Sequence, residues 1–470
     1  MGFLRAAFVL KSRPFASLVM LMLAAFALLP PSARGDDWPQ WLGPRRDGVW
    51  REAGLIEAFP KDGPAIRWRA TIGSGYGGPA VAGGRVYVMD RVLKPDTARP
   101  KDPYQKVTVP GSERVLCLNE ADGKAIWTHE YDCPYGLSYG AGPRTTPAVD
   151  GKCVYALGAE GDLLCLDVDS GKPLWSRKLA SENKPTPMWG FAASPLVDGD
   201  KVICTTGDPD GVISAFDKKT GKVLWSALSA KEPGYSSPVI YQAAGKRQLI
   251  QWVPESVNSL DPVTGNVYWS VKHGPAKYGM SIITPRFCHD PQLGDLLFVA
   301  TQYEGSLMLK LGQDEKGEPT ASVLWKRAGK SERKTDAIHT VFAAPLLRDG
   351  HVYGCDVLGQ LRCLDIKTGD RLWETTAATT YDAGPQKWSS AFIVPLGDTG
   401  SRCLLPNEHG DSILADLTPS GYKQISRAHL IEPANLDPGR PVVWSEPAFA
   451  DHCIYWRNDK ELVCASLARN

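Results

Sequence analysis

The stretch that decides the fold is Gly161-Asp-Leu-Leu-Cys-Leu-Asp167 followed by Ser170-Gly-Lys-Pro-Leu-Trp175. It reads as a short apolar strand, a turn built on Asp and Gly, and a second strand that closes on Trp. Two further strand-like runs precede it, Thr146-Pro-Ala-Val-Asp-Gly151 and Val154-Tyr-Ala-Leu-Gly158. Working outward in both directions, similar units of four short runs return along the chain.

The repeat has the length of a propeller blade. A closing Trp stands at 68, 127, 175, 225, 269, 325 and 373, with Ile425 in the Trp place of the seventh unit. The spacings between these Trp residues range from 44 to 59, close to the roughly 40–50 residues of one four-stranded blade. The inner-strand starts number eight: Pro79, Pro147, Pro195, Pro238, Pro285, Pro345, Ala391 and Pro447.

The two ends of the array complement each other. The last unit stops at Leu467 after three strands, whereas Ile66-Arg-Trp68 is an outer strand with no unit before it. Joining them would complete the eighth blade and remove both open sheet edges. We therefore predict an all-β fold: an eight-bladed β-propeller of four-stranded antiparallel blades, with the ring closed by an N-terminal strand and the propeller spanning residues 60–470.

Composition agrees with one such ring and excludes other classes. The 470 residues include 46 Gly, 37 Pro and 15 Trp, largely one blade's turn and strand residues used repeatedly. The formal net charge of +1 leaves no basic field for nucleic acid. The hydrophobic share of 43% is that of a globular core. Length alone would also allow several domains.

The first 35 residues have the features of a secretory signal peptide. Basic residues precede an uncharged apolar run from Phe15 to Leu29, and Ala33-Arg34-Gly35 offers small residues for cleavage after Gly35. The run is shorter than a bilayer-spanning helix requires. We expect a periplasmic or secreted, monomeric protein with no transmembrane segment and a net charge of −3 after removal of the four leader cations. Residues 36–59 then form a Trp- and Arg-rich extension packed on the blades.

The cysteines point to packing more than to bridges. All 11 follow the leader, and the odd count leaves at least one free thiol. Cys117, Cys165 and Cys363 recur at one place in the repeat, which suits a small buried residue in a sheet. A bridge between Cys453 and Cys464 across a hairpin depends on a register that the sequence leaves open.

The turn and Trp pattern L-D-x-x-T-G-K-x-x-W resembles that of quinoprotein-like propellers. This family includes dehydrogenases that use pyrroloquinoline quinone (PQQ) and the propeller component of the outer-membrane protein assembly machine. The resemblance covers residues 60–470, and the start Trp38-Pro-Gln-Trp41-Leu-Gly43 is similar to the opening of secreted bacterial PQQ-binding-like members. It implies that each Trp docks against the Gly turn of the next blade. Because the repeated residues are architectural, the resemblance implies a fold more than an activity.

A candidate binding ring lies just before the inner strands. In a blade the turns between second and third strands share one face with the connections between blades, and the non-repetitive residues collect there. An aromatic or basic residue followed by small residues recurs at nearly every blade, and flat rings beside polar groups suit a planar cofactor, a sugar or a peptide side chain. Packing between the blades is the alternative. The candidates are Arg144, Trp189, Tyr235, His339, Trp388 and Trp444.

Other channel-face residues offer weaker signals. Arg144 would clamp a ligand carboxylate or pair with a neighbouring Asp. Asp208, Asp210 and Glu304 have the oxygen ligands that Ca²⁺ prefers, although acidic residues next to Gly are also ordinary turn chemistry. The run Asn407-Glu408-His409 is denser in polar groups than a turn requires. The long insertion from Asp90 to Glu113 is expected to be an irregular loop on this face, where it would cover the channel, meet a partner or decorate the surface.

Three functions remain open from the sequence. The first is an exported binding or scaffolding module whose channel face meets a protein or glycan partner without a cofactor. The second, implied by the resemblance, is a PQQ- and calcium-dependent dehydrogenase of alcohols or sugars. The third is a hydrolytic or lyase site in the same cleft. The chain lacks the adjacent-Cys disulfide of alcohol-oxidising relatives and has no haem motif, which favours the first.

Overall fold

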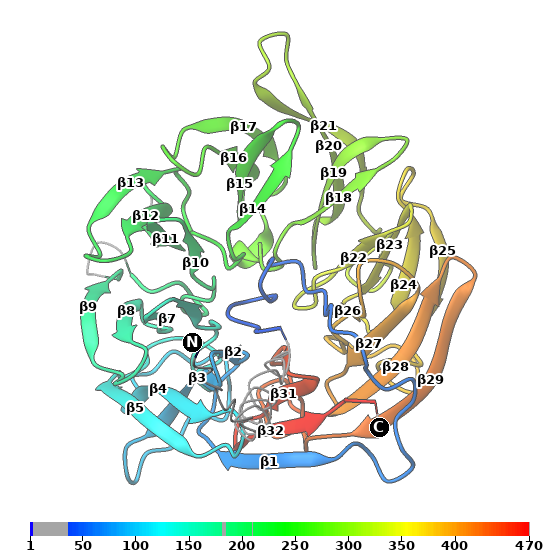
Figure 1. Cartoon of the computed structure of the whole chain (residues 1–470). Coiled ribbons are helices and arrows are strands. Elements are labelled where there is room, and N and C mark those ends of the chain that lie inside the picture. The colour runs from blue at the N-terminus through cyan, green and yellow to red at the C-terminus, as the bar shows by residue number, and fades with distance from the viewer. Residues whose placement is uncertain (3–35, 181–184, 209, 470) are drawn as a thin grey trace.

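The strands of this protein form a ring of eight four-stranded antiparallel sheets in a computed structural model (Figure 1). The structure describes residues 1–2, 36–180, 185–208 and 210–469, so the predicted signal peptide and its cleavage site lie almost wholly outside it. The described residues contain 32 strands and a single 3₁₀ turn, Lys277–Gly279. The predicted all-β, eight-bladed propeller is confirmed.

Each of the first four complete blades runs from an inner to an outer strand in chain order. The first comprises β2 (Ala80–Ala82), β3 (Arg85–Leu93), β4 (Gly111–Asn119) and β5 (Ala125–Asp132). The second comprises β6 (Ala148–Asp150), β7 (Cys153–Leu157), β8 (Asp162–Asp167) and β9 (Pro173–Lys178). The third comprises β10 (Leu196–Asp198), β11 (Lys201–Thr205), β12 (Ile213–Asp217) and β13 (Val223–Ala227). The fourth comprises β14 (Val239–Ala243), β15 (Lys246–Val253), β16 (Ser256–Leu260) and β17 (Val267–Lys272).

The remaining blades repeat this order. The fifth comprises β18 (Arg286–Asp290), β19 (Gly294–Thr301), β20 (Gly305–Gln313) and β21 (Pro319–Arg327). The sixth comprises β22 (Leu346–Arg348), β23 (His351–Cys355), β24 (Leu361–Asp365) and β25 (Arg371–Thr375). The seventh comprises β26 (Val394–Pro395), β27 (Arg402–Pro406), β28 (Asp411–Thr418) and β29 (Gly421–His429). The eighth comprises β30 (Ala448–Ala450), β31 (Cys453–Arg457), β32 (Glu461–Ser466) and β1 (Ile66–Thr71).

The ring is closed by the N-terminal strand, as predicted. Strand β1 pairs antiparallel with β32, and Trp68 lies opposite Cys464. The eighth sheet therefore contains the two ends of the propeller chain, which hold each other in register. Closure gives the eighth blade its outer strand, so that no blade is left with three strands.

Neighbouring blades are joined by the closing Trp residues. The indole Nε1 of Trp127 donates to Val168 O at 3.0 Å, and its ring lies against Gly171 in the turn of the next blade. Trp175 makes the same contacts with Lys218 O and Gly221. Gly is needed at these turns because φ is +68° at both Gly171 and Gly221 and the ring leaves no room for a Cβ.

In the seventh blade the residue that replaces the closing Trp is Ser426, and not Ile425. The register of the other blades places the Trp opposite the third strand just beyond a bulge, and in the seventh blade Ser426 takes that place, opposite Leu414. Ile425 is the preceding residue, so its assignment to the Trp place is wrong by one position. Phe59 of the N-terminal extension is buried here in the same cluster as Leu414, and its amide donates to Ser426 Oγ at 2.9 Å.

The extension, residues 36–59, crosses the channel on the face of the turns between first and second strands (Figure 1). It pairs with the first blade through Trp38 and Val81, and with the seventh through Trp50 and Leu396. Between these points it enters the channel, where Arg46 donates to the carbonyls of Ser194 and Pro195. The extension therefore blocks one end of the channel, a more central position than the blade surface expected for it.

The cysteines are free thiols in the structure. Cys453 and Cys464 lie on adjacent strands, but Cys453 is opposite Ser466 and Cys464 is opposite Tyr455, so the register offsets them by two residues. The repeated Cys117, Cys165 and Cys363 are buried in their sheets, in accord with the packing role inferred from the repeat. Across the described part of the chain, no helix has the length and apolarity needed to cross a membrane.

Candidate functional site: an aromatic cup in the channel

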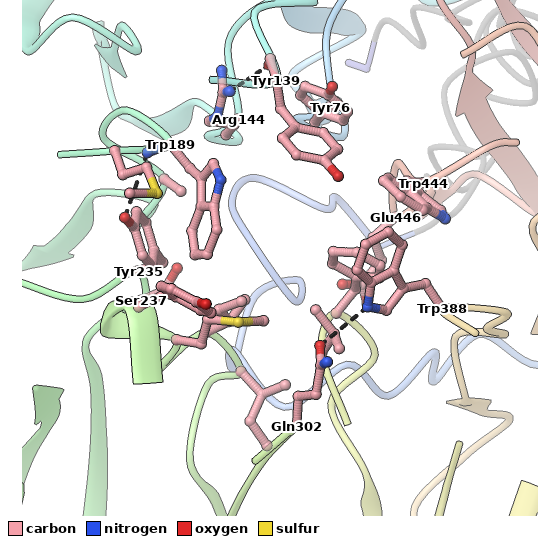
Figure 2. Close-up of a pocket in the computed structure, with 18 of the residues that line it drawn as sticks. Tyr76, Tyr139, Arg144, Trp189, Tyr235, Ser237, Gln302, Trp388, Trp444 and Glu446 are labelled. Carbon is pink, nitrogen blue, oxygen red and sulfur yellow. Dashed lines mark hydrogen bonds between the residues drawn. The ribbon is translucent and has the colours of Figure 1, made fainter. Parts of the chain in front are cut away.

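The connections between blades enclose a cavity of about 530 Å³ at the open end of the channel (Figure 2). Its wall comes from the segments just before the inner strands of all eight blades, together with two loops between second and third strands. Half of its 24 lining side chains are aromatic. These are Trp41, Tyr76, Tyr104, Tyr139, Trp189, Tyr235, Tyr278, Tyr303, Phe342, Trp388, Phe392 and Trp444. We call this cavity the cup.

Five of the six predicted ring residues meet in the cup. Trp189 and Tyr235 come from adjacent blades, and their rings are 5.3 Å apart. Trp444 stacks at a tilt on Phe342, with ring centroids 4.6 Å apart. Trp388 also lines the cavity (Figure 2). These contacts also pack one blade connection against another, so the same side chains both pack together and line the cavity.

His339 does not face the cup, so its inclusion in the candidate ring is wrong. It is buried behind the wall, where one ring nitrogen lies 2.9 Å from Gln302 O and the other 3.1 Å from the amide of Gly329. Phe342, three residues further along the chain, lines the cup where His339 was expected. The sixth blade's connection thus carries its aromatic residue nearer to the inner strand than the His in the motif indicates.

Arg144 lines the cup and is held by backbone carbonyls. Its guanidinium donates to the backbone carbonyls of Ser138, Tyr139 and Gly142, and lies 5.1 Å from the centre of the Tyr76 ring. It pairs with no Asp among the described residues, and three of its five N–H donors are used on these carbonyls. Arg144 therefore shapes the connection that precedes the second blade.

Two parts of the cup were not singled out by the sequence as site residues. The insertion between β3 and β4 does reach the channel face, and there Tyr104 packs edge-on against Tyr139 at 5.2 Å. Trp41 of the extension reaches the cup, and its Nε1 donates to Thr284 Oγ1 at 3.0 Å. The only sequence feature that pointed to these residues was that they are aromatic and lie outside the repeat. Neither the insertion nor the extension has a periodic pattern that would predict its position.

The floor of the cup contains one carboxyl group. Glu446 precedes β30 and lines the cavity, and no hydrogen bond joins its carboxyl to another described residue. Burial raises the pKa of Glu446 to about 8, and the Arg286 guanidinium opposes this shift. Arg286 in turn donates to Asp47 O of the extension. Glu446 is thus a carboxyl that holds its proton at neutral pH, beside the segment that closes the channel.

The polar run Asn407-Glu408-His409 supports the wall from behind. Glu408 is buried, receives two hydrogen bonds from Arg440 Nη2 at 3.0 and 2.9 Å, and accepts from Ser389 Oγ at 2.6 Å. Trp444 Nε1 lies 3.5 Å from its second oxygen. Glu408 therefore joins the two connections that carry Trp388 and Trp444. Its polar contacts stabilise the wall and do not face the cavity.

The lining does not fit calcium-bound PQQ. PQQ carries three carboxylates, and Ca²⁺ takes six to eight oxygen ligands, several of them anionic. The cup presents one carboxyl group, and three of the five N–H donors of Arg144 are taken by carbonyls. Nowhere in the described ranges do three or more His, Cys, Asp or Glu side chains form a group suited to a metal. Glu304, one of the acidic turn residues, bonds locally to Thr301 and the Lys277 amide.

Comparisons with known proteins give two kinds of relative. The chain is 21% identical over 329 residues to outer membrane protein assembly factor BamB of Yersinia pestis, covering 67% of this chain and 72% of that protein. It is 28% identical over 198 residues to quinohemoprotein alcohol dehydrogenase ADH IIB of Pseudomonas putida, covering 40% of this chain. The match spans only 25% of that enzyme's length.

A solved structure supports the architecture, and a family model gives the classification. The quinohemoprotein alcohol dehydrogenase of Comamonas testosteroni superposes with a TM-score of 0.61 at 14% identity, over 92% of this chain and 81% of that one, which shows a shared fold. The family model described as outer membrane protein assembly factor BamB matches residues 111–316 and 253–468. The chain therefore belongs to this family of PQQ-repeat β-propellers.

Proposed function

We propose that this protein is an exported binding or scaffolding module that holds an apolar part of a protein partner in its cup. The observation that carries the proposal is the cup itself, a cavity of about 530 Å³ whose wall is half aromatic. Cavities of this size with mainly apolar walls and few polar groups are typical ligand sites. Trp and Tyr are also the residues that most often dominate binding energy at protein interfaces.

The polar atoms of the wall favour an apolar guest over a glycan. Trp41, Trp388 and Trp444 direct their indole N–H groups at Thr284, Gln302 and Glu408, and the Tyr76 hydroxyl is bonded to Asp437. What these side chains leave for a ligand is largely ring surface. A glycan needs many hydrogen-bonding partners for its hydroxyls, and burying them without partners is costly.

The family relationship supports a protein partner. The Yersinia pestis relative that matches most of both chains is named for outer membrane protein assembly, whereas the dehydrogenase match spans a quarter of the enzyme. The dehydrogenase remains the rival proposal because the same fold carries that activity. The poor fit of the cup to a calcium-bound tricarboxylate counts against it.

A binding experiment separates the proposals. The full chain, expressed with its own leader, is titrated by calorimetry with three probes: an uncharged peptide, acetyl-Gly-Trp-Leu-Phe-Gly-amide; cellotetraose; and PQQ with CaCl₂. We expect saturable peptide binding that weakens at least tenfold in Trp189→Ala and in Trp388→Ala, since buried Trp anchors are worth about 2 kcal/mol or more. Leu174→Ala, exposed on β9 away from the cup, is the control.

Three results would contradict the proposed function, and each points to a different alternative. Saturable binding of PQQ with calcium, followed by dye reduction with alcohols or sugars, would replace the proposal with the dehydrogenase. Tighter binding of cellotetraose than of the peptide would replace the protein partner with a glycan. Peptide affinity unchanged by both Trp substitutions would show that the cup is not the binding site.

A further inference from the structure

The unsatisfied polar atoms of the cup wall are hydrogen-bond donors with one exception. Trp189 Nε1 and Gln302 Nε2 have no partner among the described residues, but the protein encloses both atoms, so neither reaches a guest in the cup. Lys387 Nζ lies 4.5 Å from the centre of the Trp388 ring and forms no ion pair in the described structure. The Lys387 ammonium is therefore the spare donor of the side wall, and a donor recognises a guest through an acceptor.

The exception is Glu446, the carboxyl group in the floor. It stands on the connection before β30, next to the crossing of the extension, and has no hydrogen-bond partner in the described structure. Glu446 is half-buried, and an ionised carboxylate there would be an acceptor beside apolar walls without a bonded donor, an arrangement that disfavours the charged form. A protonated carboxyl would instead add one more donor to the floor.

The charged groups around Glu446 are mostly committed elsewhere. Arg286, on β18, is the cation that acts on it directly; its Nη2 donates to the extension at Asp47 O, whereas its Nη1 is buried without a hydrogen-bond partner among the described residues. The Asp47 carboxylate is paired with Arg51 of the extension, and the Arg46 guanidinium is held by carbonyls of the third blade's connection. Arg144 and Lys387 belong to the side wall. Among the residues that the structure describes, the cup lining therefore has no second carboxylate to share a proton with Glu446.

We propose that the cup recognises an uncharged apolar group that carries a hydrogen-bond acceptor, and that the protonated carboxyl of Glu446 donates a hydrogen bond to this acceptor. This inference rests on the proposed function and specifies the chemistry of the guest. Such a group occurs in an aromatic ketone and in a peptide carbonyl flanked by apolar side chains. A charged guest would lose its hydration among aromatic faces without a bonded counter-ion.

The protonation state follows from the site. Burial raises the pKa of Glu446 to about 8, so the carboxyl is mainly protonated at pH 7 and ionised at pH 9. Only the protonated form donates. Binding of an acceptor should therefore weaken as the pH rises past 8, by about tenfold for each further unit when the donor is essential.

The test uses matched naphthalene probes, read out by calorimetry on the full chain. 2-Acetylnaphthalene carries one carbonyl acceptor, and 2-ethylnaphthalene has the same shape without it. 1-(2-Naphthyl)ethylammonium and 2-naphthoate are the cationic and anionic counterparts. The variants are Glu446→Gln, which keeps an N–H donor but does not titrate, and Glu446→Leu, which has no donor. Glu315→Gln, exposed in the turn after β20, is the control.

We expect the ketone to bind up to about tenfold more tightly than the hydrocarbon at pH 6, with most of this preference lost at pH 9. Glu446→Gln should keep the preference at both pH values, and Glu446→Leu should bind the two probes equally. If Glu446→Leu does not fold, the pH-independent preference of Glu446→Gln carries the test. Glu315→Gln should behave as the unsubstituted protein.

Several results would overturn the inference. Equal and pH-independent binding of ketone and hydrocarbon would leave the cup as an apolar site and remove the role of Glu446. Tighter binding of the ammonium, increasing towards pH 9, would make Glu446 a carboxylate receptor for cations. Tighter binding of the naphthoate would make the wall an anion site. Failure of all four probes to bind would overturn the proposed function together with the inference.

Discussion

Substituting Gly221 by Ala tests how tightly the blades are joined. Gly221 lies in the turn between β12 and β13, has φ of +68°, and an added Cβ would stand 2.7 Å from Cε3 of Trp175 in the preceding blade. Gly199, in the turn between β10 and β11 of the same blade, has φ of +59° and no atom within 4 Å of an added Cβ. The two positions share the backbone constraint and differ in the contact with Trp.

The expected magnitudes follow from that difference. An Ala in the left-handed region costs about 1–2 kcal/mol, partly offset by about 0.4–1 kcal/mol from the smaller entropy of the unfolded chain. These two contributions apply to both positions, so Gly199→Ala should destabilise the ring by about 1 kcal/mol. At Gly221 the ring of Trp175 must also move, and overpacking of this kind costs about 1–3 kcal/mol. Gly221→Ala should therefore cost about 2 kcal/mol more.

The assay is urea unfolding of the full chain at neutral pH, followed by far-ultraviolet circular dichroism and tryptophan fluorescence. Gly221→Ala should lower the unfolding midpoint clearly more than Gly199→Ala does. In a double-mutant cycle, Trp175→Leu should remove most of the extra cost of Ala at 221, because no large ring then opposes the Cβ. Equal midpoints for the two Gly variants would refute the reasoning that Trp docking leaves no space at this turn.

Three further predictions address the floor, the extension and the thiols. Burial raises the pKa of Glu446 from 4.5 to about 8, so the folded state holds this proton more tightly than the unfolded chain. The unfolding free energy should therefore fall by roughly 3–4 kcal/mol between pH 5 and 8 relative to Glu446→Gln, and parallel urea-midpoint profiles would contradict this. Arg46→Ala should free the extension from Ser194 and expose it to trypsin before the blades, which limited proteolysis with mass spectrometry detects. All 11 cysteines should titrate with Ellman's reagent in denaturant and remain mostly unreactive in the native protein, since the neighbouring Cys464 and burial raise the pKa of Cys453.

Much of the fold was predictable because the residues that define a blade act locally and recur in each unit. The Asp-Gly turns, the Pro before each inner strand and the Trp of each outer strand all act within one unit or between neighbours. Closure by β1 was predictable from what each end of the chain lacked. The replacement of the seventh Trp by Ser426 was not, because a strand bulge decides which side chain faces inward and the sequence does not locate a bulge to within one residue.

The cup was predictable only in part. Trp189 and Trp388 follow the repeat into the wall, but His339 turns away because its ring nitrogens are satisfied by Gln302 and Gly329 behind it. Trp41 lies far along the chain from the blades whose connections it meets. Its position depends on where the extension crosses the channel, which is settled by tertiary contacts and not by local pattern. The carboxyl of Glu446 stood in a motif noted for its Trp, and only the enclosure around it reveals its altered pKa.

The crossing of the channel by the extension also sets a direction for the whole molecule. Asp37 is bonded to Gly83, at the turn face of the first blade, while the cup opens on the opposite face. Anything joined to the chain ahead of Asp37, such as a purification tag or a surface linker, therefore starts from the underside of the ring. A protein immobilised by that end would present its cup outward, with the mouth free to receive a ligand.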